Sequence, residues 1–463
     1  MTGAPGFVST RDLQGRGVPF ETALLGGLAP DGGLYVPDRI PAIAPGWRAA
    51  GSLADAAEAT LAPWFEADEA PGWLADARAA MDFVVPLRRL DDATWLLELF
   101  HGPTRAFKDV AARTLGRWWA RALARHGRRA LVLVATSGDT GGAVAAGMAG
   151  VPGLEVIVLF PRAGVSPVQR AQLTAVRPGV RALAVDGSFD DCQRLVKEAF
   201  RDPALSDLPL TSANSINLGR WLPQAAFHVW GLAQLAQAGV DPAQTAVVVP
   251  SGNLGDLAAG LLAAAMGAAP ARLVAAHNAN AYLAERLAGR RAPFDFPPTV
   301  ATLSNAMDVG APSNFERLHA LWGDRPPVPL TAERVDDAAT LARIAETHRR
   351  TGVVVCPHTA VGLEVADRIR RRAGGARQCV AGDERGGPAP GAWLVLATAH
   401  PAKFPEVVAR ALPGVAVEDE VLAALAAAPR AETALAPTLS ALRREIRRPA
   451  RARTDPARRR LGA

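Results

Sequence analysis

Cysteine is scarce in this sequence, and long hydrophobic runs are missing from it. The 463 residues include three cysteines, Cys192, Cys356 and Cys379, which is too few for a disulfide framework and indicates a reducing compartment. The N-terminus has no basic segment followed by an apolar one, so no secretory signal is expected. The uncharged stretch 257–271 is too short for a membrane span and predicts a buried helix. These features favour a cytoplasmic protein without a membrane segment.

Lysine is also scarce. Of the 51 basic residues only Lys108, Lys197 and Lys403 are lysines, and all the others are arginines. Arginine keeps the positive charge but stays protonated, so it cannot act as an amine nucleophile. A position that has kept lysine is therefore a candidate for amine chemistry.

The positive charge is concentrated at one end of the chain. The formal net charge is +6, but residues 441–463 contain nine arginines and two acidic residues, a balance of +7, and the other 440 residues therefore carry −1. A nucleic-acid-binding protein usually spreads its positive charge over a folded face. We therefore expect a solvated tail and no nucleic-acid partner, with an acidic partner for the tail as the open alternative.

Apolar runs alternate with Ala- and Leu-rich segments from residue 95 onward. The pattern predicts strands at 130–135, 154–160, 181–185, 245–249, 272–276, 352–355 and 393–397, and helices at 114–126, 140–149, 190–200, 222–238, 254–266, 332–351 and 360–372. This alternation is typical of the α/β class, with parallel sheets and crossover helices. The length predicts two parallel-sheet α/β lobes with a cleft between them, plus a smaller N-terminal α+β module. We expect domain limits at 1–95, 96–430 and 431–463, the last holding a C-terminal helix and the Arg-rich tail.

Two glycine-rich loops follow predicted strands, where ligands bind in α/β proteins. The first, ATSGDTGG at 135–142, opens a helix, and its main-chain N–H groups and the hydroxyls of Ser137 and Thr140 suit a carboxylate or a phosphate. The second, PSGNLGD at 250–256, lacks the Gly-Lys-Ser/Thr of a nucleotide P-loop and suits a single phosphate group. Each loop could equally be an ordinary strand-to-helix turn.

Lys108 lies in a third segment, ELFHGPTRAFKD at 98–109, close to the start of a predicted helix. A helix N-terminus and a neighbouring Phe107 both favour a neutral amine, which is the form that attacks a carbonyl group. Lys197 has charged neighbours on a helix and is expected to face solvent. A reactive lysine combined with a loop for one phosphate indicates a pyridoxal 5'-phosphate site.

The same motifs carry a family resemblance. The chain resembles the threonine synthase family, in the bacterial and fungal branch of the fold-type II pyridoxal-phosphate enzymes. The resemblance rests on GLAPDGGLYVP near the N-terminus, on ELFHGPTRAFKD, TSGDTGGA, SANSINLGRWLPQ, PSGNLGD, LSNAMDVGAPSNFERL and PHTAVG, and on TAHPAKF near the C-terminus, all in the family's order. The insertion at 377–391 and the Arg-rich tail match no family motif.

The resemblance implies a role for each matching residue. Lys108 would bind the cofactor covalently and act as the catalytic base. The other cofactor-binding residues would be Asp139, Gly252, Asn253, Leu254, Gly255, Asp256 and Thr398, with Thr398 at the pyridine nitrogen. The substrate-binding residues would be Ser137, Thr140, Asn214, Asn217, Arg220 and Arg162. No metal ligands are expected.

The implied reaction converts O-phospho-L-homoserine and water to L-threonine and phosphate. The nearest alternatives are a threonine or serine dehydratase and a phospho-lyase similar to threonine synthase, because these enzymes share the lysine and the glycine loops. An alternative of another class is a non-catalytic binding protein that uses the basic tail. We expect a small-molecule substrate and a monomer or small homo-oligomer.

Overall fold

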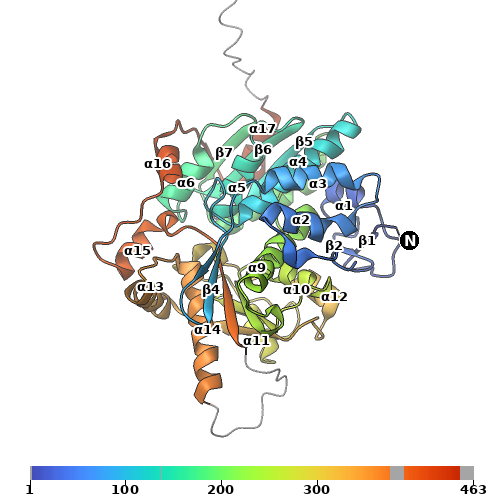
Figure 1. Ribbon diagram of the computed structural model, residues 1–463. Helices are drawn as coiled ribbons and strands as arrows, with labels where there is room; N and C mark the ends of the chain where they lie inside the picture. Colours follow the sequence, from blue (N-terminus) through green and yellow to red (C-terminus); the bar gives the residue numbers. More distant parts are fainter. Residues whose placement is uncertain (1–2, 137, 376–389, 449–463) are drawn as a thin grey trace, which may run out of the picture.

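Two parallel sheets organise the molecule (Figure 1). The computed structural model describes residues 3–136, 138–375 and 390–448. The six-stranded sheet has the order β11 (Leu330–Arg334), β10 (Arg272–His277), β9 (Thr245–Pro250), β12 (Ala392–Ala397), β4 (Thr94–Glu98) and β3 (Leu87–Arg89). The five-stranded sheet has the order β13 (Thr433–Leu435), β7 (Val180–Val185), β6 (Leu154–Pro161), β5 (Ala130–Ala135) and β8 (Leu210–Thr211). All neighbouring strands are parallel except β3 and β4. The predicted α/β class with two parallel sheets is confirmed.

Helices connect the strands of both sheets. The helices after residue 96 are α4 (Lys108–Arg125), α5 (Asp139–Gly147), α6 (Pro167–Thr174), α7 (Phe189–Arg201), α8 (Leu218–Trp221), α9 (Ala225–Gln237), α10 (Gly255–Ala265), α11 (Tyr282–Leu287), α12 (Phe315–Trp322), α13 (Asp337–Thr351), α14 (Pro357–Gly375), α15 (Pro405–Ala411), α16 (Glu420–Ala427) and α17 (Leu439–Arg447). Among the described residues, none of the helices is long and apolar enough to cross a membrane. The apolar stretch at 257–271 forms most of α10, which is buried as predicted.

Both faces of the central strands are buried, as expected for sheets covered by helices on each side. In β9, Val247 and Val249 pack into the main core, whereas Ala246 and Val248 pack on the other face, against α14. The strands of the five-stranded sheet alternate in the same way. The main core therefore lies between the two sheets, and α4, α5, α9 and α10 contribute to it.

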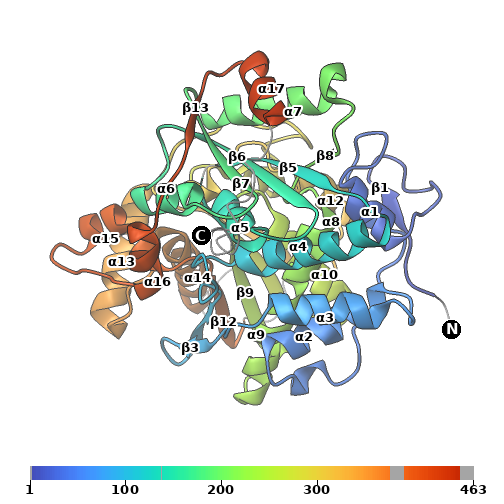
Figure 2. The ribbon, with the colours of Figure 1, turned by 90° about the horizontal axis from the view of Figure 1, so that it is seen from above.

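The N-terminal region forms a layer over α4 and α9 (Figure 2). It consists of the antiparallel strands β1 (Phe7–Ser9) and β2 (Tyr35–Pro37) and the helices α1 (Phe20–Gly26), α2 (Leu53–Leu61) and α3 (Ala70–Ala80). The rings of Phe20 and Trp118 meet edge to face at 5.2 Å, and the Trp118 indole donates to the carbonyl of Trp73 at 2.9 Å. Aromatic packing thus fixes this layer on α4. The expected domain limits at 95 and 430 stay a prediction.

The predicted strand at 352–355 is wrong. Gly352 ends α13 in a left-handed conformation, with φ of 71°, and α14 begins at Pro357. Residues 353–356, between these helices, form no strand. Val355 is nevertheless buried in the core beside α14. An apolar run in a short helix connection has the same composition as a buried strand, which explains the error.

A strand that was not predicted, β11, pairs with β10 and overlaps the start of the predicted helix 332–351 at residues 332–334. The helix itself, α13, begins only at Asp337, where the Asp336 carboxylate accepts from the amide of Ala339 at 2.8 Å. The helix predicted at 114–126 begins earlier than expected, at Lys108. The sequence at 431–448 contributes β13 and α17, which packs against α7. Most of the insertion at 377–391 and the Arg-rich tail beyond 448 lie outside the described residues.

Candidate active site

Lys108 is the first residue of α4 and follows the loop that leaves β4. The amide of Phe107 donates to the carbonyl of Thr398 at 2.9 Å, which joins the start of α4 to the end of β12. The Lys108 Nζ atom lies 5.5 Å from the centre of the Phe107 ring, and the lysine is partly buried. The predicted position of this amine at a helix N-terminus is confirmed.

Burial is the main influence on the charge of Lys108. It lowers the pKa of Lys108 to about 8. The negative charges of Asp139 and Asp256 oppose this shift, whereas the positive charges of Lys403 and Arg220 reinforce it. A substantial fraction of the Lys108 amine is therefore neutral near physiological pH.

A set of buried hydrogen bonds holds the loop in front of Lys108. Asp109 accepts from the Thr104 amide at 2.8 Å and from the Thr104 hydroxyl at 2.6 Å. The Thr104 carbonyl accepts from Gln172 at 2.8 Å and from Lys403 Nζ at 2.9 Å. Gly102 leaves room for this arrangement, since a Cβ there would lie 2.6 Å from an Asp109 carboxylate oxygen. The loop is thus fixed from both sides.

The glycine loop after β9 has free main-chain donors. Among the described residues, the N–H groups of residues 252–256 have no hydrogen-bond acceptor, and Leu254 turns the chain into α10 with a positive φ of 61°. A Cβ on Gly252 would lie 2.7 Å from the Met307 Cα, and one on Gly255 would lie 3.2 Å from an Asn314 side chain. Free N–H groups at a helix start suit a phosphate group.

The Asn253 side chain shapes this loop. Its carbonyl oxygen accepts from the Ser313 amide at 2.7 Å and from the Ser313 hydroxyl at 2.9 Å, and its amide donates to the Ser215 hydroxyl. Asn314 donates to the main-chain carbonyl of Asn253 at 3.1 Å. Because both polar atoms of the Asn253 side chain already have protein partners, its main-chain N–H is the better placed group for a ligand.

Asp256 lies buried in the first turn of α10. One of its carboxylate oxygens lies 2.7 Å from His228 Nε2, and the other has no partner among the described residues. A histidine beside a carboxylate fixes the orientation of both groups. The carboxylate therefore contributes a negative charge near Lys108, in addition to the main-chain N–H that it offers in the loop.

Asp139 opens α5 at the end of β5 and forms a buried ion pair with Lys403 at 2.8 Å. Gln169 from α6 also donates to Asp139, at 3.0 Å. Burial favours the protonated carboxyl, but the charges of Lys403 and Lys108 outweigh burial and hold the pKa of Asp139 well below its usual range. Thr140 is partly exposed beside Asp139, and Ser137 lies outside the described residues. This ion pair brings together the ends of the two sheets.

Arg220 from α8 is buried, with 3% of its surface exposed. Its Nη1 donates to the Ala213 carbonyl at 2.6 Å, and its Nε has no partner among the described residues. Burial lowers the pKa of Arg220 to about 10, and Asp109 opposes this shift. A buried guanidinium without a carboxylate beside it is costly unless an anion binds. Arg220 is therefore a candidate for anion recognition.

The other predicted site residues differ in whether their side chains already have hydrogen-bond or ion-pair partners. Asn217 is fully engaged, because it donates to the Leu24 carbonyl at 2.9 Å and accepts from the Gly219 amide at 2.8 Å. Asn214 is partly exposed, and its side chain has no hydrogen bond among the described residues. Arg162 is exposed at the end of β6 and pairs with Asp186 at 3.0 Å.

Sequence reasoning missed several polar residues around Asp139. Gln169 is buried and accepts from Asn305 at 3.2 Å, and His358 accepts from the Ala306 amide at 3.2 Å. Burial lowers the pKa of His358 to about 4, although the charge of Asp139 opposes this shift. The family motifs contain Asn305, His358 and Lys403, but only the scarcity of lysine singled out one of them, Lys403.

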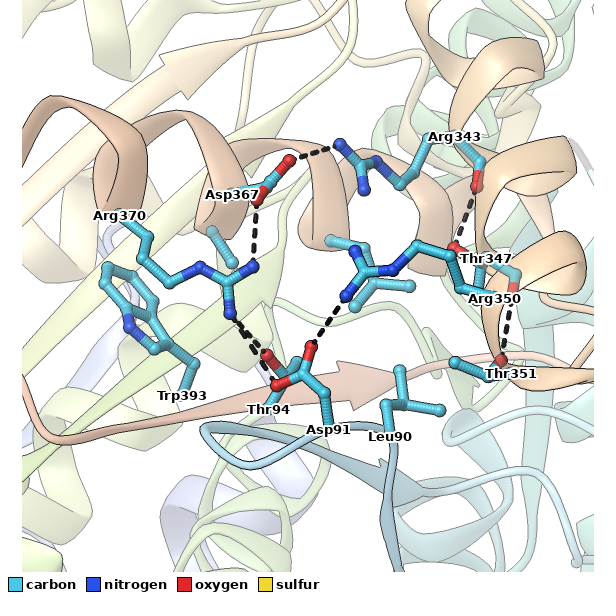
Figure 3. Close-up of a pocket in the computed structure, with 12 residues that line it drawn as sticks. Leu90, Asp91, Thr94, Arg343, Thr347, Arg350, Thr351, Asp367, Arg370 and Trp393 are labelled. Atoms are coloured by element: carbon cyan, nitrogen blue, oxygen red, sulfur yellow. Dashed lines mark hydrogen bonds and ion pairs between the residues drawn. The ribbon is translucent and has the colours of Figure 1, made fainter. Parts of the chain in front are cut away.

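A pocket between α13, α14 and the β3–β4 turn contains none of the predicted site residues (Figure 3). Arg343 pairs with Asp367 at 2.6 Å, and Arg370 pairs with the same carboxylate at 3.0 Å. Arg350 and Arg370 also point toward Asp91, at 3.5 and 3.6 Å. Each of the three arginines in this pocket has an acidic partner, which is typical of a structural network that joins two helices to a sheet.

The residues gathered around Lys108 suit pyridoxal phosphate. They include an amine that is partly neutral, a loop of free N–H donors with glycines where a Cβ would collide, and a buried Thr398 whose hydroxyl has no partner among the described residues. They also include the unpaired Arg220 for an anionic substrate. The predicted cofactor residues therefore come from the carboxyl ends of β4, β5, β9 and β12.

Family comparisons agree with this geometry. Residues 84–381 match the pyridoxal-phosphate dependent enzyme family, residues 6–71 match the threonine synthase N terminus, and residues 359–446 match the threonine synthase C-terminal family. Threonine synthase from Pseudomonas aeruginosa is 35% identical over 451 residues, covering 88% of this chain and 90% of that protein. Threonine synthase from Escherichia coli is 36% identical over 411 residues, covering 84% and 87%.

Solved structures show the same likeness. The pyridoxal-phosphate-bound threonine synthase from Brucella melitensis is 33% identical, with a TM-score of 0.82 over 96% of this chain and 99% of that chain. Threonine synthase from yeast is 28% identical, with a TM-score of 0.84 over 96% and 99%. A threonine deaminase from Solanum lycopersicum, 13% identical over 76% of this chain and 95% of that chain, has a TM-score of 0.51 and shares the fold alone.

Proposed function

The chain belongs to the threonine synthase family, and we propose from this that it converts O-phospho-L-homoserine and water to L-threonine and phosphate at the site around Lys108. The observation that carries the proposal is the partly neutral Lys108 amine, which lies among residues from both sheets. In the reaction the C–O bond at Cγ breaks and phosphate leaves, Cγ gains a proton, and Cβ loses a proton and gains the hydroxyl of water.

Pyridoxal phosphate, when bound, stabilises negative charge at the substrate Cα. We propose that Lys108 binds it covalently and that the N–H groups of residues 252–256 hold its phosphate. Thr398 would face the ring nitrogen, and Asp139 would orient the ring. Each of these residues is supported by its burial or by its free donors rather than by a direct contact.

We assign the anionic groups of the substrate to Arg220 and to the start of α5. The Nε atom of Arg220 has no hydrogen-bond partner among the described residues, and charge-assisted hydrogen bonds to carboxylate or phosphate are the strong ones. The free side chains of Asn214 and Thr140 are proposed as further substrate contacts, together with Ser137. Asn217 would act by holding α8, which carries Arg220, rather than by touching the substrate.

Lys108 is proposed as the general base and acid. It would take the proton from Cα, remove a proton from Cβ, return one to Cγ after phosphate has left, and return one to Cα after water has added at Cβ. An amine with a pKa of about 8 suits this work, because it can both accept and release protons near neutral pH. Exclusion of water from the closed site would prevent early hydrolysis of reactive species.

The experiment that tests the proposal is an end-point assay with O-phospho-L-homoserine. Threonine and phosphate should form in equal amounts, and Lys108→Ala should abolish both. Formation of 2-oxobutyrate in place of threonine would instead support a dehydratase or a related phospho-lyase. The N-terminal and C-terminal threonine synthase matches favour the synthase.

A visible absorption spectrum of the purified chain separates enzyme from non-catalytic binding protein. The wild type should show a band near the visible edge that Lys108→Ala lacks. A wild-type chain without that band that binds nucleic acid would favour a binding role for the basic tail. We further propose that the chain is a cytoplasmic monomer or small homo-oligomer without a nucleic-acid partner. The formal net charge of −1 outside the tail supports the absence of a nucleic-acid partner.

A further inference from the structure

Lys403 is the most deeply buried lysine of the chain. None of its surface is exposed, and it lies in the turn after β12. Its Nζ atom contacts Asp139 at 2.8 Å and donates to the Thr104 carbonyl at 2.9 Å. One ammonium group therefore joins the start of α5, the loop in front of Lys108 and the end of the six-stranded sheet.

The partners of Lys403 are themselves held in place. Thr104 is fixed by Asp109 through its amide and hydroxyl, and Gln169 donates to Asp139 at 3.0 Å. A fully buried ion pair costs desolvation energy, so its presence is weak evidence for a role in stability. Its position beside the reactive amine suggests a role in the chemistry of Lys108.

We propose that Lys403 is a positioning residue that offsets the charge of Asp139 and so keeps the Lys108 amine available for reaction. The inference rests on the proposed function, since it assigns Lys108 the reacting amine. Asp139 alone would draw a proton onto Lys108, because a carboxylate favours a nearby ammonium. Lys403 neutralises that carboxylate and adds repulsion against a second positive charge.

Several charged groups act on Lys108 together. Asp139 and Asp256 favour its protonated form, and Lys403 and Arg220 disfavour it. His358 is also coupled to Lys108, but burial keeps its pKa near 4 and the imidazole neutral at physiological pH. Removing Lys403 should therefore raise the pKa of Lys108, whereas removing the charge of Asp139 should lower it.

The test is competitive labelling of the full-length chain after removal of cofactor. Acetic anhydride reacts with neutral amines, and mass spectrometry of the Lys108 peptide against an added reference peptide gives the labelling rate at each pH. Because the chain has only three lysines, the peptides are easily resolved. Neither cofactor nor turnover is needed, so failure of this inference is separate from failure of the proposed function.

The two substitutions should have opposite effects. If each shifts the pKa by about one unit, Lys403→Met slows labelling of Lys108 at pH 7.5 roughly eightfold and Asp139→Asn speeds it roughly threefold. Lys197→Met removes an exposed lysine and should leave the labelling profile unchanged. A change of the Lys108 labelling rate in the same direction for both variants, or no change in either, would overturn the proposal.

Thermal unfolding separates this role from a purely structural one. Each single substitution leaves a buried charge unpaired, so both should lower the melting temperature. The double variant Lys403→Met with Asp139→Asn should regain most of that loss and bring the Lys108 labelling profile back toward wild type. If a single variant does not fold, the double variant is compared with wild type alone. A Lys108 labelling rate in the double variant that differs several-fold from wild type would contradict the proposal that the charges of Lys403 and Asp139 offset each other.

Discussion

Replacing Gly252 by alanine should weaken cofactor binding by crowding the phosphate loop. The added Cβ would lie 2.7 Å from the Met307 Cα and 3.1 Å from its carbonyl oxygen. An ordinary contact starts at 3.4 Å, so the loop or the Met307 main chain must move. Overpacking of this kind typically costs about 1–3 kcal/mol. If that strain falls on the bound loop, the Kd for pyridoxal phosphate rises roughly 5- to 150-fold.

A graded set of glycine variants makes this prediction sharp. Gly255→Ala should have a smaller effect, because its Cβ meets only the end of the Asn314 side chain, at 3.2 Å. Gly51→Ala is the control, since its Cβ would lie at an ordinary 3.5 Å from Asp55, on an exposed segment. Titration of the cofactor-free chain, followed by absorbance, measures each Kd. A Kd of Gly252→Ala within twofold of wild type would refute a phosphate-binding role for the loop at 252–256. A larger loss of cofactor affinity in Gly51→Ala than in Gly252→Ala would refute it as well.

Three further substitutions test other parts of the structure. Arg220→Met should lower kcat/KM roughly 30-fold or more, because a contact to an anionic group of the substrate is lost. The melting temperature should stay unchanged or rise, because the substitution removes a buried charge that has no acidic partner among the described residues. A large drop in the melting temperature would contradict this reasoning. Burial opposes ionisation of Asp367, but the hydrogen bond from Arg343 and neighbouring arginines outweigh it and lower its pKa below 3.8. Asp367→Asn should therefore cost about 1–3 kcal/mol of unfolding free energy at pH 7 in urea titrations. The difference in unfolding free energy between wild type and variant should shrink as the pH falls through the lowered pKa of Asp367. A difference that does not change with pH would exclude this account. Arg162→Met should change kcat/KM less than threefold, because Arg162 forms an exposed pair with Asp186; a tenfold loss in a steady-state assay would place Arg162 at the substrate.

The sequence predicts a place at the edge of a sheet for residues that follow a strand closely, and the structure has them there. Asp139, Gly252 and Thr398 each come just after a buried apolar run, and parallel strands bring their carboxyl ends to one edge of a sheet. Lys108 was found for another reason, namely that few lysines remain in the chain. Loop glycines and strand ends are local signals, so they can be read without knowledge of the tertiary structure.

Contacts between the two sheets could not be predicted in this way. Asp139 and Lys403 are far apart in the sequence, and nothing in the local pattern of either residue indicates the other. The same limit explains the error at 352–355, where Val355 is buried as expected, and Val353 and Val354 in part, but in a helix connection rather than in a strand. Apolar composition reports burial, whereas the choice between strand and loop depends on how the flanking helices are placed.

The distribution of lysine follows from these contacts. Lys197 is exposed on α7, where arginine would carry the same charge equally well. Lys108 differs because an arginine in its place would stay protonated and could not attack a carbonyl group. Lys403 differs for a steric reason, since it has no exposed surface and holds Asp139 and Thr104 with one compact ammonium group. A planar guanidinium with five donors would need more room and more acceptors than this buried position supplies. At two of the three positions, the preference for lysine over arginine is therefore explained by the chemistry and the size of the amine, since both side chains can carry the same charge.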